Sequence, residues 1–191
     1  IIGARGGLQL KPINTINAGE LSNPIFSNLI LNSPFTFLHS FKSEKLFSYN
    51  YFSDEELNNT ISLNRNYISE KEKKYNVVVI IMESLSKEFV GFHNNHNLTP
   101  FLDSLMNHSL VFTNAYSNGL RSIEALPAIT ASIPTLSNTP FISSVYAQNK
   151  FNSLPSILSK KGYSTSFFHG GTRGTMGFYG FAGKAGFQKY F

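Results

Sequence analysis

Two polar segments of this chain carry residue types that α/β enzymes use for chemistry. Glu83 directly follows an apolar run at residues 76–82, and Ser122 stands beside Arg121 about forty residues later. A buried parallel strand that ends in a carboxylate delivers a metal ligand or catalytic acid to the edge of a sheet. A hydroxyl beside an arginine, opening a helical stretch, is suited to anchor a transferred anionic group. Together the two segments indicate an enzyme site.

The elements that would position these groups alternate from residue 76 onward. Apolar runs predict strands at residues 77–82, 110–114 and 163–168. Helices are predicted after the N-cap Thr99, over residues 122–131, and from a cap at Asn152 or Ser153 to Gly162. This order implies an α/β fold with a mostly parallel sheet covered by helices.

His169 is a third candidate group, because it follows the last predicted strand and precedes two glycines. Ligands of open α/β sheets gather at the carboxyl ends of the strands. We therefore expect Glu83, Ser122 and His169 to open onto one cleft. The Glu83 carboxylate and the Ser122 hydroxyl should approach within about 6 Å, so that one cation can bridge them. Each group alone also has an ordinary explanation, as a surface charge, a helix cap or a loop residue.

The composition narrows the class of protein. Hydrophobic residues make up 41% of the 191 residues and aromatic residues 14%, which favours a folded chain over a disordered one. The formal net charge of +5 suits an anionic partner, but the basic residues are scattered and predict no nucleic-acid arm. The chain has no cysteine, so disulfides, thiolate catalysis and cysteine-bound metals are excluded.

Residues 1–73 differ from the rest, because they are rich in Asn, Ser and aromatic side chains and show little periodicity. A charged connector at residues 69–74 predicts a boundary there, and Ser53 with the acids after it predicts a helix start. The chain shows no signal peptide, and residues 21–41 are too interrupted by Pro and Asn to span a membrane. Both ends look cut, so we expect a fragment of a longer protein.

Four segments carry a family resemblance, at residues 76–84, 98–105, 118–127 and 167–171. They resemble the sulfatase-like branch of the alkaline phosphatase superfamily, in particular lipoteichoic acid synthase-type phosphoglycerol transferases, over residues 74–191. Related phosphoethanolamine transferases place a nucleophilic Thr five residues before a Pro, and Ser122 and Pro127 keep that spacing. The resemblance implies a truncated three-layer α/β sandwich, alkaline phosphatase-like, with a mostly parallel sheet. Residues 1–73 would be the extracytoplasmic linker that follows a missing membrane domain, and residues 5–14 look like its start.

The resemblance also implies roles for single residues. Ser122 matches the catalytic nucleophile, which is Thr in well-known members, and Glu83 matches a carboxylate metal ligand that shares the metal with Ser122. Arg121 and His169 would bind substrate. The expected cofactor is a divalent metal, manganese in the first place, with zinc or magnesium as alternatives.

The implied reaction moves a phosphoglycerol-like group from a phospholipid donor to a cell-envelope acceptor. It would take place outside the cytoplasmic membrane, to which missing N-terminal helices would attach the protein. The family completes its metal site with an Asp-His pair far downstream. We therefore expect the chain as given to be inactive and to bind metal poorly.

Other readings stay open at this point. A formylglycine sulfatase needs Cys or Ser, Pro two positions on and Arg two beyond; residues 132–136 lack the Arg, and residues 122–126 lack both. Hydrolysis of a phosphoric ester remains an alternative, because water can release the same covalent intermediate. Phosphoethanolamine transfer and a degenerate, non-catalytic binding module are further alternatives. An Asp-His pair downstream would support an enzyme over such a module.

Overall fold

The computed structural model describes residues 8, 15–18, 26–41, 46–61, 73–94 and 97–191. It divides into two compact units. The first unit consists of Ile1–Leu46 and Tyr116–Phe191, and the second of Phe47–Ala115. The linker-like start at residues 5–14 and the charged connector at residues 69–74 lie largely outside the described residues. The predicted boundary after residue 73 stays a prediction.

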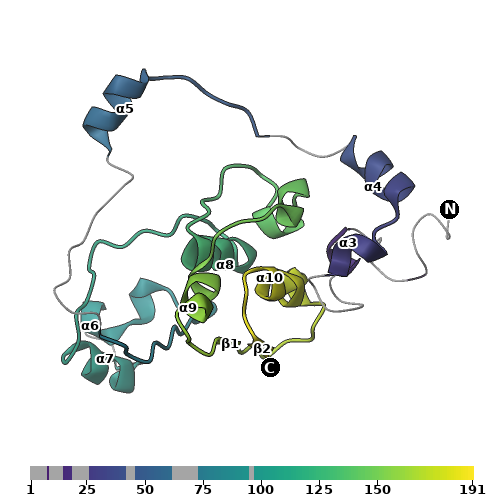
Figure 1. Ribbon diagram of the computed structural model, residues 1–191. Helices are drawn as coiled ribbons and strands as arrows, with labels where there is room; N and C mark the ends of the chain where they lie inside the picture. The colour runs from purple at the N-terminus through teal and green to yellow at the C-terminus, as the bar shows by residue number, and fades with distance from the viewer. Residues whose placement is uncertain (1–7, 9–14, 19–25, 42–45, 62–72, 95–96) are drawn as a thin grey trace. The chain divides into compact units, whose positions relative to one another are not determined.

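The first unit is mainly helical in its described part (Figure 1). Its elements, in chain order, are η1 Thr15–Asn17, α3 Ser27–Ile30, α4 Ser33–Ser40, α8 Ser122–Ala131, η4 Phe141–Ser143, η5 Val145–Gln148, α9 Leu154–Lys160, β1 Ser166–Phe167, η6 Thr175–Gly177, α10 Phe178–Lys184 and β2 Lys189–Tyr190.

Helix α8 spans the residues that the sequence predicts, from Ser122 to Ala131. It tolerates Pro127 in its interior, and this proline is fully buried. The helix ends where Ser132 adopts a left-handed conformation, with φ at 54°. The amides of Ser132 and Ile133 then donate back to the carbonyls of Ala128 and Pro127, each at 3.1 Å. This closing motif reverses the chain and sends residues 132–140 back along the helix.

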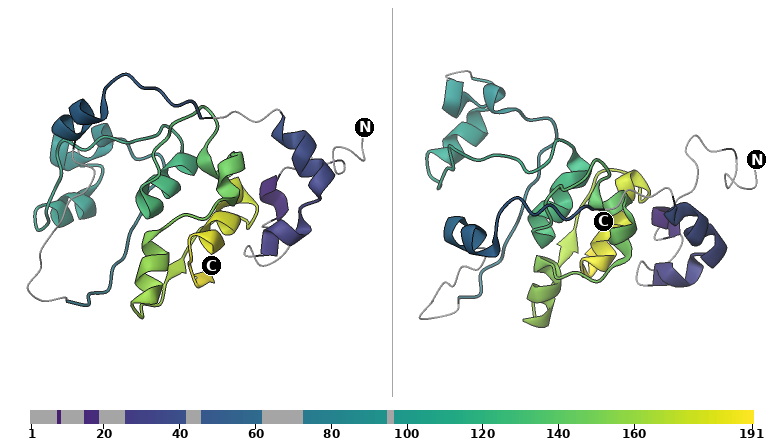
Figure 2. Two further views of the ribbon diagram at one scale, coloured as in Figure 1. Left: turned by 45° about the horizontal axis from the view of Figure 1, so that its top comes forward. Right: turned by 90° about the horizontal axis from the view of Figure 1, so that it is seen from above.

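Helix α9 also begins and ends as predicted. Ser153 caps it, because the Ser153 hydroxyl accepts from the Ser156 amide at 3.2 Å. Gly162 follows the helix with φ at +86°, the left-handed conformation that favours glycine. The Ser153 hydroxyl in turn donates to the Ala185 carbonyl just after α10. The cap of one helix therefore ties it to the end of another, and Figure 2 shows α9 and α10 from two further directions.

Strands β1 and β2 pair in parallel, with Ser166 opposite Lys189 and Phe167 opposite Tyr190. Helix α10 lies between them in the chain, so the three elements form a small strand–helix–strand crossover. The hydrogen bonds continue past β1, since the His169 amide donates to the Phe191 carbonyl at 2.9 Å. The predicted third strand at residues 163–168 is thus confirmed only in its last part.

The core of the first unit is apolar and largely aromatic. The rings of Phe151 and Phe181 stack with centroids 5.7 Å apart, and Phe141 meets Phe151 edge to face at 5.5 Å. Such pairs add about 0.5–1.5 kcal/mol to the burial of the rings themselves. The buried members of the core cluster are Leu126, Ile142, Phe178, Phe181 and Ala185.

The second unit contains four short helical elements in its described part: α5 Asp54–Thr60, η3 Lys87–Phe89, α6 Gly91–Asn94 and α7 Pro100–Met106. The predicted caps of α5 and α7 behave differently. Ser53 caps α5 in a reciprocal pair with Glu56, as the sequence predicts. Thr99 precedes α7 as predicted, but its hydroxyl donates to the Asp103 carboxylate at 2.9 Å and makes no capping bond to an amide.

Two predicted strands are absent from the described residues. Residues 77–82 form no regular secondary structure, and their exposed fractions run from 49% to 82%, so the prediction of a buried strand is wrong for this structure. Residues 110–114 form no strand either, and they end in a turn. A strand exists only where a neighbour completes its hydrogen bonds, and the described part of the second unit supplies none for these runs. What the structure shows of the α/β class is its helices and the two-stranded parallel sheet.

Within the part of the chain that the structure describes, we find no helix long and apolar enough to cross a membrane.

Candidate functional site

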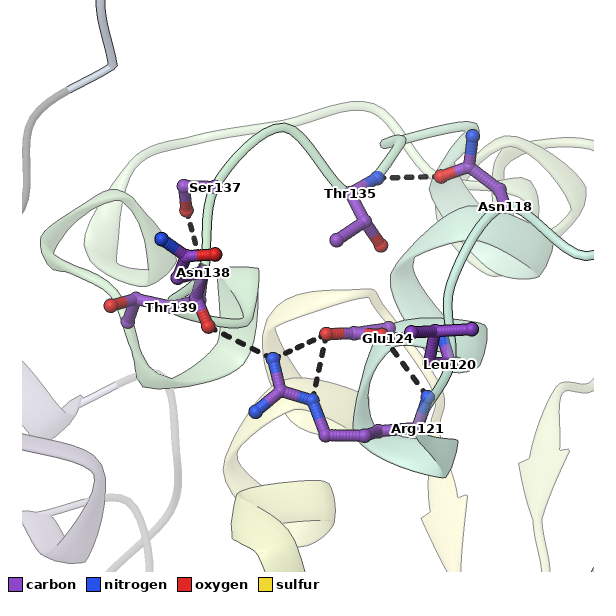
Figure 3. A network of polar contacts seen from close by, with 8 residues as sticks. All are labelled: Asn118, Leu120, Arg121, Glu124, Thr135, Ser137, Asn138 and Thr139. Carbon is purple, nitrogen blue, oxygen red and sulfur yellow. Dashed lines mark hydrogen bonds and ion pairs between the residues drawn. The ribbon is translucent and has the colours of Figure 1, made fainter.

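Ser122 is the first residue of α8, and the loop before it is held by one buried carboxylate. Glu124 is 6% exposed, and its Oε2 atom accepts from the backbone amides of Leu120 at 2.8 Å and Arg121 at 3.1 Å (Figure 3). Its Oε1 atom accepts from Nε of Arg121 at 2.9 Å and from the Nη2 atom of the same guanidinium. A glutamate three residues after a helix cap can satisfy otherwise unpaired amides in this way.

The second contact of Arg121 ties this loop to the segment after α8. Nη2 of Arg121 also donates to the Asn138 carbonyl at 2.9 Å (Figure 3). At the other end of the loop, the Asn118 side-chain oxygen accepts from the Thr135 amide. Residues 118–121 are thus fastened at both ends to residues 135–138. Because the guanidinium is rigid and planar, its two bonds to Glu124 also set its orientation.

Gly119 lets the Glu124 side chain lie against the loop. A Cβ atom on Gly119 would come within 2.7 Å of the Glu124 Cβ and Oε2 atoms, and within 2.9 Å of the Thr135 hydroxyl. Contacts this short require something to move, so glycine is needed here for close approach. Gly119 therefore serves the packing of Glu124.

The hydrogen bond from Arg121 lowers the pKa of the Glu124 carboxyl below its ordinary value, and the Leu120 and Arg121 amides act in the same direction against burial. The carboxylate form is the one that accepts all of these bonds. Glu124 was not among the residues predicted from the sequence. The sequence signal that points to Glu124 is a glutamate at the third position of a helix, because a side chain there can accept from the backbone amide of the residue before the helix.

Glu83 lies in the second unit, in a turn with Ser84, and both residues are exposed. The Ser84 hydroxyl contacts the Glu83 carboxylate at 3.4 Å, and Ser84 has a positive φ of 56°. A positive φ is uncommon for a residue other than glycine and marks the turn as a defined conformation. Because Glu83 and Ser122 belong to different units, their predicted approach to within about 6 Å stays a prediction.

His169 lies in the first unit, just after β1, among aromatic rings. Its ring meets Phe178 edge to face with centroids 5.0 Å apart, and its Nδ1 atom is 3.5 Å from the Tyr190 hydroxyl. The Gly171 amide donates to the same Nδ1 atom at 3.2 Å. An Nδ1 that accepts places the proton of a neutral imidazole on Nε2, which makes that atom a donor.

The structure therefore gathers the predicted site residues only in part. Ser122 and Arg121 are adjacent, and Arg121 is directed to Glu124 and Asn138. A cavity of about 280 Å³ opens beside this network, with Glu124 among the residues that line it. That His169 shares a cleft with Glu83 and Ser122 stays a prediction.

A sequence model of the sulfatase family matches residues 75–191. The chain belongs to the sulfatase family. The match includes Glu83, Arg121, Ser122 and His169, and it confirms the resemblance to that family that the sequence motifs indicate. Family membership implies an alkaline phosphatase-like α/β fold and an enzyme of the sulfatase or phosphotransferase kind.

Among curated proteins, this sulfatase-family chain is similar to lipoteichoic acid synthase 2 of Bacillus subtilis (strain 168). The two are 29% identical over 116 residues, which is 58% of this chain and 17% of the relative. The chain thus spans about a sixth of the length of that relative. No solved structure matches it.

Members of this family generally depend on a metal ion. The described residues contain no group of three or more His, Cys, Asp or Glu side chains that could hold one. Glu83 and Ser122 offer a carboxylate and a hydroxyl oxygen, which are the donors that hard divalent cations accept. Their chemistry fits such a cation, but these two ligands alone are fewer than a divalent site requires.

Proposed function

We propose that the protein containing this chain is a metal-dependent transferase that moves a phosphoglycerol-like group from a phospholipid through a covalent intermediate on Ser122. The observation that carries the proposal is the position of Ser122 at the start of α8, within the region that matches the sulfatase family. The relative is named a synthase of lipoteichoic acid, which supports transfer over hydrolysis because a synthase forms a bond.

In the proposed first half-reaction, Oγ of Ser122 attacks the phosphorus of the donor phosphodiester. An O–P bond to Ser122 forms, the bond from phosphorus to the diacylglycerol oxygen breaks, and that oxygen takes up the proton that Ser122 releases. In the second half, an acceptor hydroxyl attacks the same phosphorus. Its proton ends on Ser122 as the Ser122–phosphorus bond breaks, so the enzyme is regenerated.

Glu83 and Ser122 would hold the divalent cation, for which we propose manganese, with zinc or magnesium as alternatives. Such a cation supplies a lowered pKa for the nucleophilic hydroxyl and neutralises charge on the phosphate. We propose that Arg121 and His169 bind the substrate. The side chain of Arg121 is 53% exposed even with its bonds to Glu124, which leaves room for an anionic oxygen.

We further propose that the acceptor belongs to the cell envelope. The catalytic domain would work outside the cytoplasmic membrane, to which the rest of the full-length protein would attach it. No nucleic acid is a proposed partner. The completed domain would be a three-layer α/β sandwich with a mostly parallel sheet.

Substitution of Ser122 tests the covalent step in the full-length protein. Ser122→Ala removes the attacking oxygen, so turnover of a phospholipid donor should fall by at least about a hundredfold, while Ser122→Thr should keep appreciable activity. Intact-mass analysis should detect a phosphoglycerol-sized adduct in the wild type and none in Ser122→Ala.

Ser33 provides a matched control, because it is also the first residue of a helix, α4, and is exposed. Ser33→Ala should retain wild-type turnover. Robust turnover by Ser122→Ala would exclude covalent transfer through this residue. An adduct that is discharged only to water would favour a phosphodiesterase, and the absence of any adduct or turnover would favour a non-catalytic module.

A further inference from the structure

We infer that Glu124 is a positioning residue for the reaction, which orients Ser122 by fixing the backbone of Leu120 and Arg121. The inference rests on the proposed function, since it assigns to Glu124 a part in the covalent step at Ser122. Glu124 itself is buried under the loop and is not proposed to touch the substrate.

The contacts of Glu124 give it this role by geometry. One carboxylate oxygen binds the amides of both residues that precede Ser122, at 2.8 Å and 3.1 Å. The other binds the side chain of Arg121, the residue that sits directly before Ser122. The backbone entering Ser122 is therefore held from two sides by a single side chain of the same helix. A nucleophile must be held to within a fraction of an ångström of its productive position, and misplacement by about 1 Å can cost a hundredfold in rate.

Arg121 directly precedes α8 but cannot serve as an ordinary helix cap. An arginine side chain has donors but no acceptor, so it cannot accept from the amides of the first turn. Glu124 instead accepts from the amides of Leu120 and Arg121, just before the helix, and Gly119 provides the space for it to do so. Two residues of the segment, Gly119 and Glu124, are thus matched to one another.

The test measures adduct formation on Ser122 in single-turnover experiments with the full-length protein and phosphatidylglycerol in detergent micelles. Glu124→Ala should lower the rate constant of adduct formation at least tenfold. The rate constant of Glu124→Gln should lie between those of the wild type and Glu124→Ala. The glutamine amide oxygen can still accept from the backbone amides, but its NH₂ group opposes the Arg121 guanidinium. A role in folding alone would reduce the amplitude of adduct formation and leave its rate constant unchanged.

Gly119→Ala is an independent variant that keeps Glu124 in the sequence but displaces its side chain by steric contact. It should also lower the rate constant, and it decides the question if Glu124→Ala fails to fold. Glu56→Gln is the matched control, because Glu56 makes the same kind of bond to its cap, Ser53, on the exposed helix α5. It should leave the rate constant unchanged.

The outcomes separate this inference from the function on which it rests. If Ser122→Ala retains turnover, the proposed function fails. If Ser122→Ala is inactive while folded Glu124→Ala and Gly119→Ala form the adduct within threefold of the wild-type rate constant, the covalent step stands and Glu124 has no positioning role.

Discussion

Two charged side chains of the first unit, buried Glu124 and half-buried Lys184, bind polar atoms of neighbouring segments. Glu124 binds two amides, and Lys184 in α10 donates from Nζ to the Gln148 side-chain oxygen and, at 3.4 Å, to the Ala147 carbonyl. Lys184 thereby connects α10 to η5 across a long separation in sequence. Partial burial lowers the pKa of Lys184 below its ordinary value of 10.5.

The lowered pKa of Lys184 predicts a pH dependence of stability. Between its folded-state pKa and 10.5, the unfolded state binds more protons than the folded state, so this residue makes stability rise with pH in that window. Urea unfolding should show the free energy of unfolding of the wild type rising relative to Lys184→Met across that window. Lys160→Met, which removes an exposed lysine from α9, corrects for the change in net charge. An unchanged difference between wild type and Lys184→Met at all pH values would contradict the prediction.

At the scale of elements, several contacts between segments of the first unit are made at the ends of helices. The Ser153 cap of α9 reaches the end of α10, and the Arg121 guanidinium at the start of α8 reaches residue 138 in the loop after that helix. Helices as short as these are marginal alone, so their stability comes from such contacts and from the shared aromatic core. The second unit offers a contrast, because α5 has a complete capping pair and no buried residue.

That contrast predicts that two similar substitutions lower the free energy of unfolding by different amounts. Ser153 is 1% exposed, and Ser153→Ala removes a cap and leaves the buried Ala185 carbonyl without its hydroxyl donor, so it should cost about 2–3 kcal/mol. Ser53→Ala removes the cap of the exposed helix α5 and should change global stability by less than about 0.5 kcal/mol. Urea denaturation followed by circular dichroism measures both. Equal losses for the two variants would show that the contact between α9 and α10 adds nothing.

At the scale of the whole molecule, the most unusual feature is a run of exposed apolar side chains. Val78 is 82% exposed and Ile80 78% exposed, in a segment whose residues are the types favoured in buried strands. The chain spans 17% of the length of its relative, and an α/β sandwich would bury this run between other strands. The sequence pattern and the structure are consistent if other strands of the full-length protein pair with this run and cover it.

We therefore predict that residues 77–82 form a central parallel strand in the full-length protein. Their amide hydrogens should exchange with solvent at least about a hundredfold more slowly than those of α5, which has no buried residue. Hydrogen–deuterium exchange read by mass spectrometry measures this. Exchange of residues 77–82 as fast as that of α5 would argue against the three-layer sandwich.

The proposed metal site also belongs to this scale, because its proposed ligands Glu83 and Ser122 are far apart in the sequence. In the full-length protein, Glu83→Ala should lose activity by weakening metal binding, with partial recovery at high Mn²⁺ concentration. Glu88→Ala, which removes a nearby exposed carboxylate, should behave as wild type. Loss of activity in Glu83→Ala with unchanged Mn²⁺ affinity in equilibrium dialysis would exclude Glu83 as a ligand.

Local chemistry made several features predictable from the sequence. The start and end of α8, the Ser153 cap, the left-handed Gly162 and the start of α7 at Pro100 follow from side chains within a few residues of one another. The family resemblance was also readable, because its motifs are short and lie in one stretch of the chain.

Pairing and approach between distant segments were decided by the tertiary structure. Residues 77–82 have the composition of a strand, but a strand depends on a partner that the pattern does not name. The role of Glu124 does not follow from the sequence for a related reason, since its burial and its match with Gly119 arise only when the loop folds onto the helix. The sequence by itself determined which residues could do chemistry and where helices begin. The fold decided which of them are held together, because contacts between distant residues depend on packing that no local pattern contains.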